Sequence, residues 1–557
     1  MREATLRSRI LIPAWLITQV VSWTGIVLVF LFRELGLGGT MGYSGHMIFY
    51  YLYTNLELPA LILNISFLIG VVLLWRYSFL SNSGCIASIR WIGTKGTGTL
   101  CLVVAVGMVT WLGSGLVFHG YALSMDEFCG NFQASIFAAG QRHAVIPPEW
   151  IPYNKALKPI FINYNETEHV WVANYLPVYA FVRSLFIRIG APSLMNPLLA
   201  AGTILLVMQI IRNLWPTEKM YSLIGGLLLA TNSAFLLTSM SLYSMSLSLF
   251  LNVTWLYLYT RNDRLGYGLA PWVGCLGLLV HQPFAHALFV LPFLLRMALE
   301  RRWVRSAYFA AVYLLGLLGC ALWWELESNP GAVSNGIKLF VLPSLFDFVT
   351  LIAATVQLVS WSTPVLALLF ILSFGGESDH NRSLCADLRW GCLLISIFYI
   401  FMPFTQGHGW GNRYFYPAWG NVIILAVFGW QRLTRIIPEA ENKALRIMVF
   451  TLIFAWGVQL PLRCWQVEGF ARPYATAMKA LESLPVDIVL LNPGQSFYAQ
   501  DLVRNAPFLD RNPKMMRIDS LTPLQIAALQ EKYRVAIIDR SNLIKFGICP
   551  SKTRHKP

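Results

Sequence analysis

The sequence has little charge, and acidic residues are especially scarce. Only 12% of the 557 residues are charged, with 27 Asp and Glu against 42 Lys and Arg, whereas soluble domains carry about 25% charged residues. An ionised side chain in hydrocarbon costs several kcal/mol. Together with 56% hydrophobic residues, this scarcity excludes an ordinary soluble enzyme and predicts a protein embedded in a membrane.

The sequence also lacks cysteine motifs, internal repeats and a cleavage site. No two of its nine cysteines stand at CxxC spacing, which excludes the common zinc and redox motifs; Cys464 and Cys549 could still pair with each other. The lack of long repeats and low-complexity tracts excludes a solenoid or a linker-rich chain. No small-residue cleavage site follows the first hydrophobic segment, so we interpret that segment as an anchor.

What the sequence does have is a series of long apolar segments. Most have about 17–24 residues, the length that crosses a hydrocarbon core of about 30 Å. Nine clear segments and four weaker ones predict about thirteen transmembrane helices. The clear segments are Leu11–Phe32, Glu57–Trp75, Gly98–Phe118, Asn196–Ile211, Tyr221–Met240, Ser241–Tyr259, Ala307–Trp324, Leu351–Ser373 and Ile447–Leu462, and the weaker ones are Tyr267–Leu279, Phe284–Leu299, Gly391–Phe404 and Ala418–Gln431.

The basic residues predict the orientation of these helices. Net charge is 42 − 27 = +15, and with a cytoplasmic N-terminus nearly all basic clusters fall on the cytoplasmic side, as the positive-inside rule requires. We therefore attribute the charge to membrane topology and expect no nucleic-acid partner. This topology places the loop 119–175, the stretch 405–417 and the chain after Arg463 on the external face. The segment Tyr175–Ile189 then lies partly in the membrane at that face.

The last part of the chain has the pattern of a small α/β domain. Strand-length apolar runs at Asp487–Leu491 and Val535–Asp539 flank a helical stretch at Pro523–Lys532. The predicted fold class is an all-α polytopic membrane protein with a small C-terminal α/β extramembrane domain. Residues 1–97 hold two extra helices, 98–462 the transmembrane core with the long external loop, and 463–557 the external domain.

Two adjacent acids, Asp126 and Glu127, directly follow the third predicted helix. Carboxylates at the mouth of a membrane helix must face water or a partner, because they are costly to desolvate. One of them could act as general base on a hydroxyl acceptor, or the pair could hold a divalent cation. Alternatively, the pair only marks the water interface.

A second candidate is the glycine-rich stretch from Gln406 to Tyr414. Its glycines let the backbone approach a ligand closely, and His408 and Arg413 are suited to bind phosphate. Trp410 and Tyr414 are side chains for an interface with lipid or a stacking surface for a sugar. An ordinary interfacial loop would have the same aromatics. His281 lies at the tip of an external hairpin and is a further candidate for the site.

The residues around this acidic pair resemble a known family. The run Asp126-Glu127-Phe128-Cys129-Gly130-Asn131-Phe132-Gln133-Ala134 is similar to the first external loop of GT-C class membrane glycosyltransferases, in their bacterial protein-mannosyltransferase-like and aminoarabinose-transferase-like branch. Tyr175-Leu176-Pro177-Val178-Tyr179, the His408–Tyr414 stretch and Asp501-Leu502-Val503-Arg504-Asn505 resemble other parts of that branch. Two features depart from it: Leu176 precedes Pro177 where a lysine is frequent, and the two helices before Gly98 are extra.

The resemblance implies a polyprenyl-phosphate-linked sugar donor and transfer, with inversion, to a glycan, lipid or protein acceptor on the external face of the bilayer. By this match Asp126 takes the place of the catalytic acidic residue and acts as general base, with Glu127 beside it, and Arg413 and His408 neutralise the departing phosphate. The bacterial inner membrane is the implied location, and a hexosyl or pentosyl transferase the implied enzyme. No His/Asp constellation predicts a metal site, although a divalent cation stays possible.

Two other function classes fit a membrane protein with these residues. A transporter or flippase of lipid-linked saccharides would use Asp126 and Glu127 to couple ions, and it would show inverted repeats with mid-membrane charges. We find no such repeat in the sequence. A saccharide polymerase or ligase would have a large late loop with arginines, whereas here the large loop comes early.

Overall fold

The computed structural model describes residues 2–37, 45–77, 96–328, 341–375, 379–402, 407–436, 440–492 and 499–548. Gln406 and Cys549 lie outside these ranges, and so does the predicted pairing of Cys464 with Cys549.

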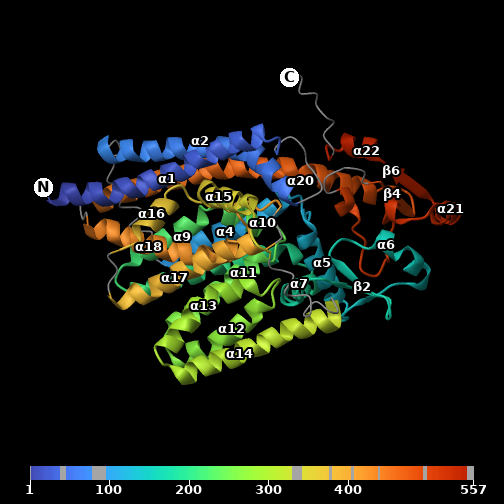
Figure 1. Ribbon diagram of the computed structural model, residues 1–557, viewed down its shortest axis with the longest axis horizontal. Coiled ribbons are helices and arrows are strands. Elements are labelled where there is room, and N and C mark those ends of the chain that lie inside the picture. Colours follow the sequence, from blue (N-terminus) through green and yellow to red (C-terminus); the bar gives the residue numbers. More distant parts are fainter. Residues whose placement is uncertain are drawn as a thin grey trace.

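The chain forms an elongated helical bundle with a mixed α/β part at one end (Figure 1). This confirms the predicted fold class. The bundle helices are α1 (Arg2–Glu34), α2 (Gly45–Tyr77), α4 (Gly96–Leu116), α8 (Met195–Leu214), α9 (Lys219–Ala230), α10 (Ser233–Met240), α11 (Met245–Thr260), α12 (Arg264–Leu278), α13 (Phe284–Leu299), α14 (Trp303–Leu322), α15 (Leu345–Ser360), α16 (Leu366–Leu372), α17 (Asp379–Phe398), α18 (Trp419–Ile436), α19 (Ala440–Phe454) and α20 (Leu460–Glu482).

Seven helical stretches within the described residues are long and apolar enough to cross a membrane, and the bent pair α9–α10 would make eight. The other predicted segments correspond to shorter helices. One reason is that two predicted spans are broken. The segment 351–373 divides into α15 and α16 around Pro364, and 221–240 divides into α9 and α10, which meet at 59°. Proline removes a backbone donor and ends the first helix of such a pair.

The two breaks face each other inside the protein. Thr231 Oγ1 and Thr363 Oγ1 are 2.9 Å apart, and the Ala234 amide donates to the Trp361 carbonyl at 3.1 Å. Non-helical backbone at membrane depth is tolerated where protein supplies such hydrogen bonds. The break places Trp361 at the centre of the bundle, 2% exposed.

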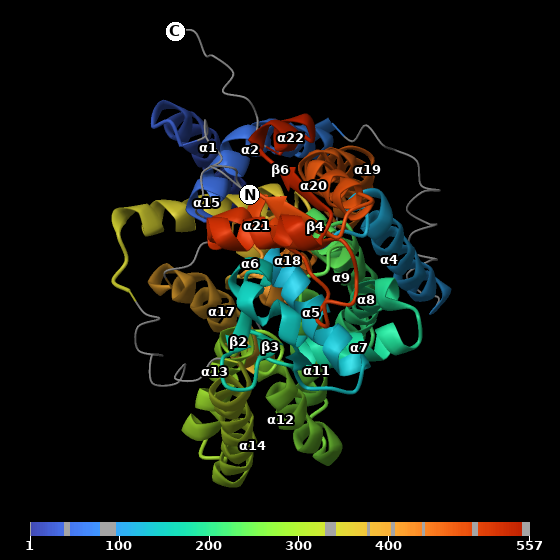
Figure 2. The same ribbon diagram turned by 90° about the vertical axis from the view of Figure 1, so that its right-hand side faces the viewer.

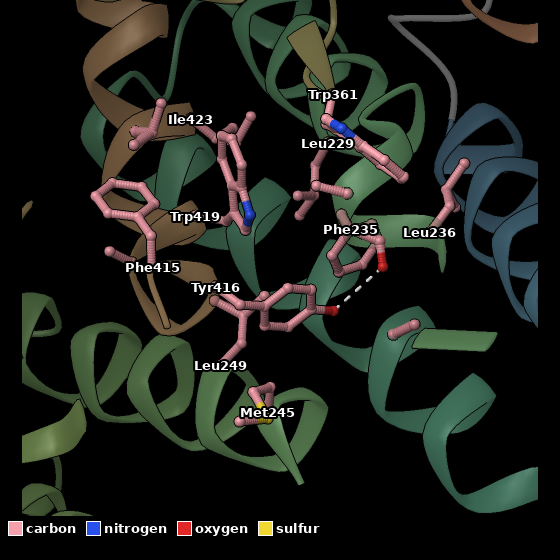
Figure 3. Close-up of a cluster of buried hydrophobic side chains, with 14 of the residues drawn as sticks. Leu229, Phe235, Leu236, Met245, Leu249, Trp361, Phe415, Tyr416, Trp419 and Ile423 are labelled. Carbon is pink, nitrogen blue, oxygen red and sulfur yellow. Dashed lines mark hydrogen bonds between the residues drawn. The ribbon is translucent and has the colours of Figure 1, made fainter. Parts of the chain in front are cut away.

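Aromatic side chains fill the core around this break (Figure 3). Phe415, Tyr416 and Trp419, at and just before the start of α18, are buried with Phe235 of α10 and with Trp361. The Tyr416 hydroxyl donates to the Phe235 carbonyl at 3.3 Å. The residues directly after the glycine-rich stretch are therefore anchored in the bundle.

The first external loop is folded. It contains α5 (Met125–Ala138), α6 (Asn154–Leu157) and an antiparallel sheet of order β1-β3-β2, formed by Ala144–Val145, Val170–Ala173 and Ile162–Asn165. It is followed by the short helix α7 (Val178–Arg188). Gln133 of α5 donates to the Arg142 carbonyl and accepts from the Ala173 amide. These bonds tie α5 to the sheet.

The C-terminal part holds a parallel sheet of order β5-β4-β6, with strands Lys514–Arg517, Ile488–Leu491 and Val535–Ile538. Helix α21 (Pro523–Lys532) precedes β6 and α22 (Arg540–Lys545) follows it. The strand β5 was not expected from the sequence; its apolar part is only Met515 and Met516. The helical stretch Glu441–Glu482 continues through position 463, so the predicted domain boundary there stays a prediction.

The C-terminal sheet and the first external loop share one hydrophobic core. Phe132 and Trp171 from the loop are buried in the same cluster as Ile488, Met516 and Leu529. Both parts lie at the same end of the molecule, opposite the N-terminus (Figure 1), and together face the viewer in Figure 2. The two segments form one cap over that end of the bundle.

Candidate active site

Asp126 lies in the first turn of α5, in the part of the cap that the first external loop forms. Ser124 is the N-cap residue and its side chain accepts from the Glu127 amide. A helix N-terminus carries unpaired amides and a positive end of the macrodipole, which favour a carboxylate in this turn. The local sequence Ser-Met-Asp-Glu thus forms a capping box. It fixes where α5 begins and therefore where Asp126 lies.

Asp126 is paired with Arg413 in a buried setting. Arg413 NH1 lies 2.7 Å from Asp126 Oδ2, and the two side chains are 8% and 13% exposed. The Tyr175 hydroxyl donates a short hydrogen bond to Asp126 Oδ1. Burial alone would raise the pKa of Asp126, but Arg413, His281 and the Tyr175 hydroxyl together hold it below its ordinary value. The carboxylate is therefore ionised and fully engaged.

His281 closes the other side of this group. Its ring centroid lies 3.9 Å from that of Tyr175, and burial lowers its pKa to about 4, so the imidazole is neutral at physiological pH. Asp126, Gly130, Tyr175 and His281 line a cavity of only about 10 Å³. This is room for roughly one water, so a sugar enters only if these side chains move.

Arg413 is held between aromatic rings at the end of the glycine-rich stretch. Its guanidinium carbon lies 4.8 Å from the ring centre of Tyr243 and 5.4 Å from that of Tyr414. The Tyr414 ring in turn stacks on Tyr399 at 4.3 Å and 6°. A guanidinium between aromatic faces is oriented without losing its charge. Arg413 therefore presents a fixed cation beside Asp126.

His408 and Trp410 form a second layer behind Arg413. The His408 Nε2 and the Tyr243 hydroxyl are 2.8 Å apart, and burial lowers the pKa of His408 to about 3, so its ring is neutral. Trp410 has a positive φ of 36° and is 3% exposed, with its ring 6.0 Å from that of Trp361. The structure thus brings Asp126, Arg413, His281 and Tyr414 together, with His408 and Trp410 one step further away.

Glu127 points away from this group. Its carboxylate accepts from the Ser124 amide at 2.8 Å and from the Leu242 amide at 2.9 Å, and the residue is 1% exposed. Burial raises its pKa to about 7, against the lowering effect of these amides. Glu127 therefore fastens the start of α5 to the segment between α10 and α11.

Sequence reasoning missed the aromatic and loop residues that support the site. Tyr175 and Tyr243 contact Asp126 and Arg413, and the Trp323 indole donates to the Tyr175 carbonyl at 3.0 Å. Tyr175 opens the Tyr-Leu-Pro motif, which was a usable signal. Nothing local marks Tyr243 or Trp323. Two basic residues of the first loop, Arg142 and His143, lie 3.0 Å and 2.6 Å from Glu327.

The arrangement combines a carboxylate, which can accept a proton, with a guanidinium, which can stabilise a negative charge. A buried carboxylate with a depressed pKa and an adjacent fixed guanidinium can act on two neighbouring atoms of one substrate. Among the described residues there is no group of three or more His, Cys, Asp or Glu side chains that could hold a metal ion.

Comparison with known proteins identifies the fold. No protein-family model and no curated protein matches this chain. The crystal structure of ArnT from Cupriavidus metallidurans bound to undecaprenyl phosphate matches with a TM-score of 0.52 at 14% identity, over 81% of this chain and 91% of that one. Its apo state gives 0.50 and 15%, over 81% and 90%.

The archaeal oligosaccharyltransferase AglB from Archaeoglobus fulgidus, in complex with an inhibitory peptide and a dolichol-phosphate, gives a TM-score of only 0.37 at 12% identity, over 77% of this chain and 64% of that one. The chain thus has the fold of ArnT, and the fold expected from the resemblance is confirmed.

Proposed function

We propose that this protein is a glycosyltransferase that moves a sugar from a polyprenyl-phosphate donor to an acceptor on the external face of a membrane. The observation that carries the proposal is the buried pair of Asp126 and Arg413 at 2.7 Å. It joins an acid of the first external loop to a cation of the last one, in a chain with the fold of ArnT.

The proposed reaction is a single displacement with inversion. Asp126 takes the proton from an acceptor hydroxyl or amine as its oxygen or nitrogen attacks the anomeric carbon. The bond between that carbon and the phosphate oxygen breaks, and the electron pair leaves with the polyprenyl phosphate. Arg413 stabilises the negative charge that develops on the leaving oxygen, and His281 and neutral His408 supply further hydrogen bonds.

Donor binding would also activate the base. In the structure Arg413 is paired with Asp126, which keeps the carboxylate a weak proton acceptor. A phosphate that draws the guanidinium toward itself removes this stabilisation and raises the basicity of Asp126. The base thus becomes competent when the leaving group is in place.

An apolar groove between α1, α15, α16, α17 and α18 supports a lipid-linked donor. Its volume is about 640 Å³, and Phe415 and Ser396 line its inner end. The same two residues line a smaller cavity that reaches Asn412 and Tyr414, on either side of Arg413. A polyprenyl chain in this groove would bring its phosphate toward Arg413.

The finer features of the proposal follow from the predicted topology. With the N-terminus in the cytoplasm of a bacterium, the cap and the site face the periplasm, and the acceptor is a glycan, lipid or protein that reaches that face. The sugar is a hexose or pentose. A divalent cation beside Asp126 would be detected as metal-dependent activity.

The test is glycosyl transfer by the purified, detergent-solubilised protein, with a panel of undecaprenyl-phosphate sugars as donors. We expect turnover in the wild type and a loss of about 10²–10⁴-fold in Asp126→Asn, the usual contribution of a general base. The matched control is Asp263→Asn, because Asp263 also begins a helix and pairs with an arginine but lies outside the site.

Equal activity in Asp126→Asn and wild type would remove Asp126 from the chemistry. If transfer is abolished in both Asp126→Asn and Asp263→Asn, the cause is unfolding. Size-exclusion profiles then show whether each variant is folded. A wild type that binds the lipid, transfers no sugar across the panel and moves it between leaflets of a vesicle would favour the flippase hypothesis.

A further inference from the structure

A fully buried ion pair joins the N-terminal hairpin to the helix that leads into the cap. Arg463 of α20 lies 2.8 Å from Glu57 of α2, and the two side chains are 0% and 1% exposed. The partners are 406 positions apart in the sequence. Such a pair deep in a bundle is costly to desolvate unless every group is satisfied.

Glu57 is satisfied by the end of α15. Its carboxylate accepts from the Trp361 indole at 2.6 Å, from the Ser360 hydroxyl at 2.8 Å and from Gln357 at 3.2 Å. Arg463 also donates to the Ser360 carbonyl at 3.1 Å. The network therefore fixes the residues at the break between α15 and α16.

Trp361 connects this network to the glycine-rich stretch. Arg463 lies over the Trp361 ring, with its guanidinium carbon 3.9 Å from the ring centre. Trp361 also packs closely against Gly411, where an added Cβ would come within 2.7 Å of the Trp361 Cβ. Gly411 has φ +91° and lies two residues before Arg413. Trp361 thus supports the turn that carries Arg413.

Stability alone does not explain why this ion pair is buried. Buried ion pairs are frequently no more stabilising than apolar residues of the same volume, and they are best attested as devices that fix one geometry. Here each partner comes from a different part of the chain. Glu57 belongs to α2 of the extra hairpin, and Arg463 belongs to α20, the helix before the C-terminal part of the cap. The network therefore fixes Trp361 from two sides.

We propose that Glu57 and Arg463 are positioning residues that hold Trp361, and through it the turn carrying Arg413, in the geometry required to bind a phosphate. The N-terminal hairpin is thereby a working part of the site. The ordering of the turn stands on the contacts above, whereas its use for a donor phosphate rests on the proposed function.

The first test measures the order of the turn directly. Amide hydrogen exchange is followed by mass spectrometry in peptides covering residues 407–418, in nanodiscs, for wild type and Glu57→Gln. We expect exchange in these peptides to be faster by roughly two- to thirtyfold, the range found for mutations along a coupled network. Exchange in peptides of β4 and α21 should not change.

The matched control is Asp387→Asn. Asp387 of α17 is 5% exposed and forms an ion pair with Arg296, outside the network of Glu57, Arg463 and Trp361. This variant loses a comparable ion pair and should leave exchange at 407–418 unchanged. If both variants accelerate exchange there, or neither does, the positioning role is overturned.

A second variant tests the positioning role again, and a lipid-binding measurement tests its use for a phosphate. Arg463→Lys keeps the charge but loses the planar group over Trp361, so it should also accelerate exchange in the turn, and an unchanged rate would contradict the proposal. Undecaprenyl phosphate binding, followed by tryptophan fluorescence, should weaken in Glu57→Gln and not in Asp387→Asn. Failure of the wild type to bind this lipid would count against the proposed function, while the exchange result still decides the positioning role.

Discussion

Asp126 and Glu127 are neighbours in the sequence, but their surroundings affect their pKa values in opposite directions. Burial would raise both. Arg413, His281 and the Tyr175 hydroxyl overcome it at Asp126, whereas the backbone amides that Glu127 accepts from do not, so that its pKa rises to about 7. Two acids whose pKa values are shifted apart in this way take different roles in a site. Asp126 is ionised and faces the cation, and Glu127 faces the backbone.

The Tyr175 hydroxyl should therefore affect the pH dependence of the reaction. Only the ionised form of Asp126 accepts a proton, so kcat/KM falls as the pH drops through its pKa. Tyr175→Phe removes a hydrogen bond that favours the carboxylate, and the pKa of Asp126 rises. We expect the acidic limb of the kcat/KM profile to move to higher pH in this variant.

The control for this measurement is Tyr164→Phe. Tyr164 lies in the same external loop, where its hydroxyl is 2.7 Å from His169, and has no contact with Asp126. Its pH profile should match that of the wild type. An acidic limb that stays in place in Tyr175→Phe would show that Asp126 is not the group titrating in the free enzyme.

At the scale of the element, the capping box of α5 explains why the acidic pair begins a helix. Glu127 satisfies the Ser124 and Leu242 amides, and an unsatisfied buried amide costs about 1–3 kcal/mol. Glu127→Ala should therefore lower the free energy of unfolding by about 2–5 kcal/mol, seen as a lower midpoint of thermal unfolding. Glu127→Gln keeps one acceptor and should lose about half of that.

Activity distinguishes capping from proton transfer at Glu127. If the residue only caps α5, Glu127→Gln keeps its activity per folded molecule within a few-fold of the wild type. A loss of about 10²-fold or more, without a matching loss of folded protein, would place Glu127 in the chemistry. Gln525 is a natural comparison, because glutamine fills the same position of the capping box of α21.

The elements that the sequence predicts best are those with a strong local signal. The apolar segments, the acidic pair and the glycine-rich stretch depend on composition and spacing, and α21, β4 and β6 depend on short-range pattern. The breaks at Thr231 and Pro364 are harder to predict, because only a few polar residues mark each one and the apolar pattern resumes directly after them. The roles of Trp361 and Arg463 could not be predicted, because in the sequence Trp361 lies inside a predicted span and Arg463 begins the predicted external domain. Their shared partner Glu57 is hundreds of residues away.

At the scale of the whole molecule, the cap is built from two segments far apart in the chain, the first external loop and the C-terminal part. The sequence predicts two external segments but not that they share a core, because Phe132 and Met516 carry no signal of their pairing. The Asn505 side chain donates to the Leu157 carbonyl at 2.7 Å and Arg517 to the Lys155 carbonyl at 2.9 Å. The C-terminal sheet is thus docked on the loop that carries the proposed base.

Arg504 belongs to the C-terminal part and contacts the residues just before α5. Its guanidinium donates to the Ala122 and Leu123 carbonyls, just before the capping box, and lies 4.1 Å from the ring centre of Tyr121. Arg504→Gln should therefore displace the start of α5 and lower kcat, because a displacement of about 1 Å at a reacting group can cost up to about 10²-fold.

Arg517→Gln is the matched variant, since it removes an arginine from the same interface at a point away from α5. Both variants should lower the midpoint of thermal unfolding by similar amounts, because each loses contacts between the C-terminal part and the loop. Only Arg504→Gln should lower kcat per folded molecule. Equal effects on kcat would mean that the C-terminal part stabilises the loop as a whole. The specific contact at the start of α5 would then have no separate role in placing Asp126.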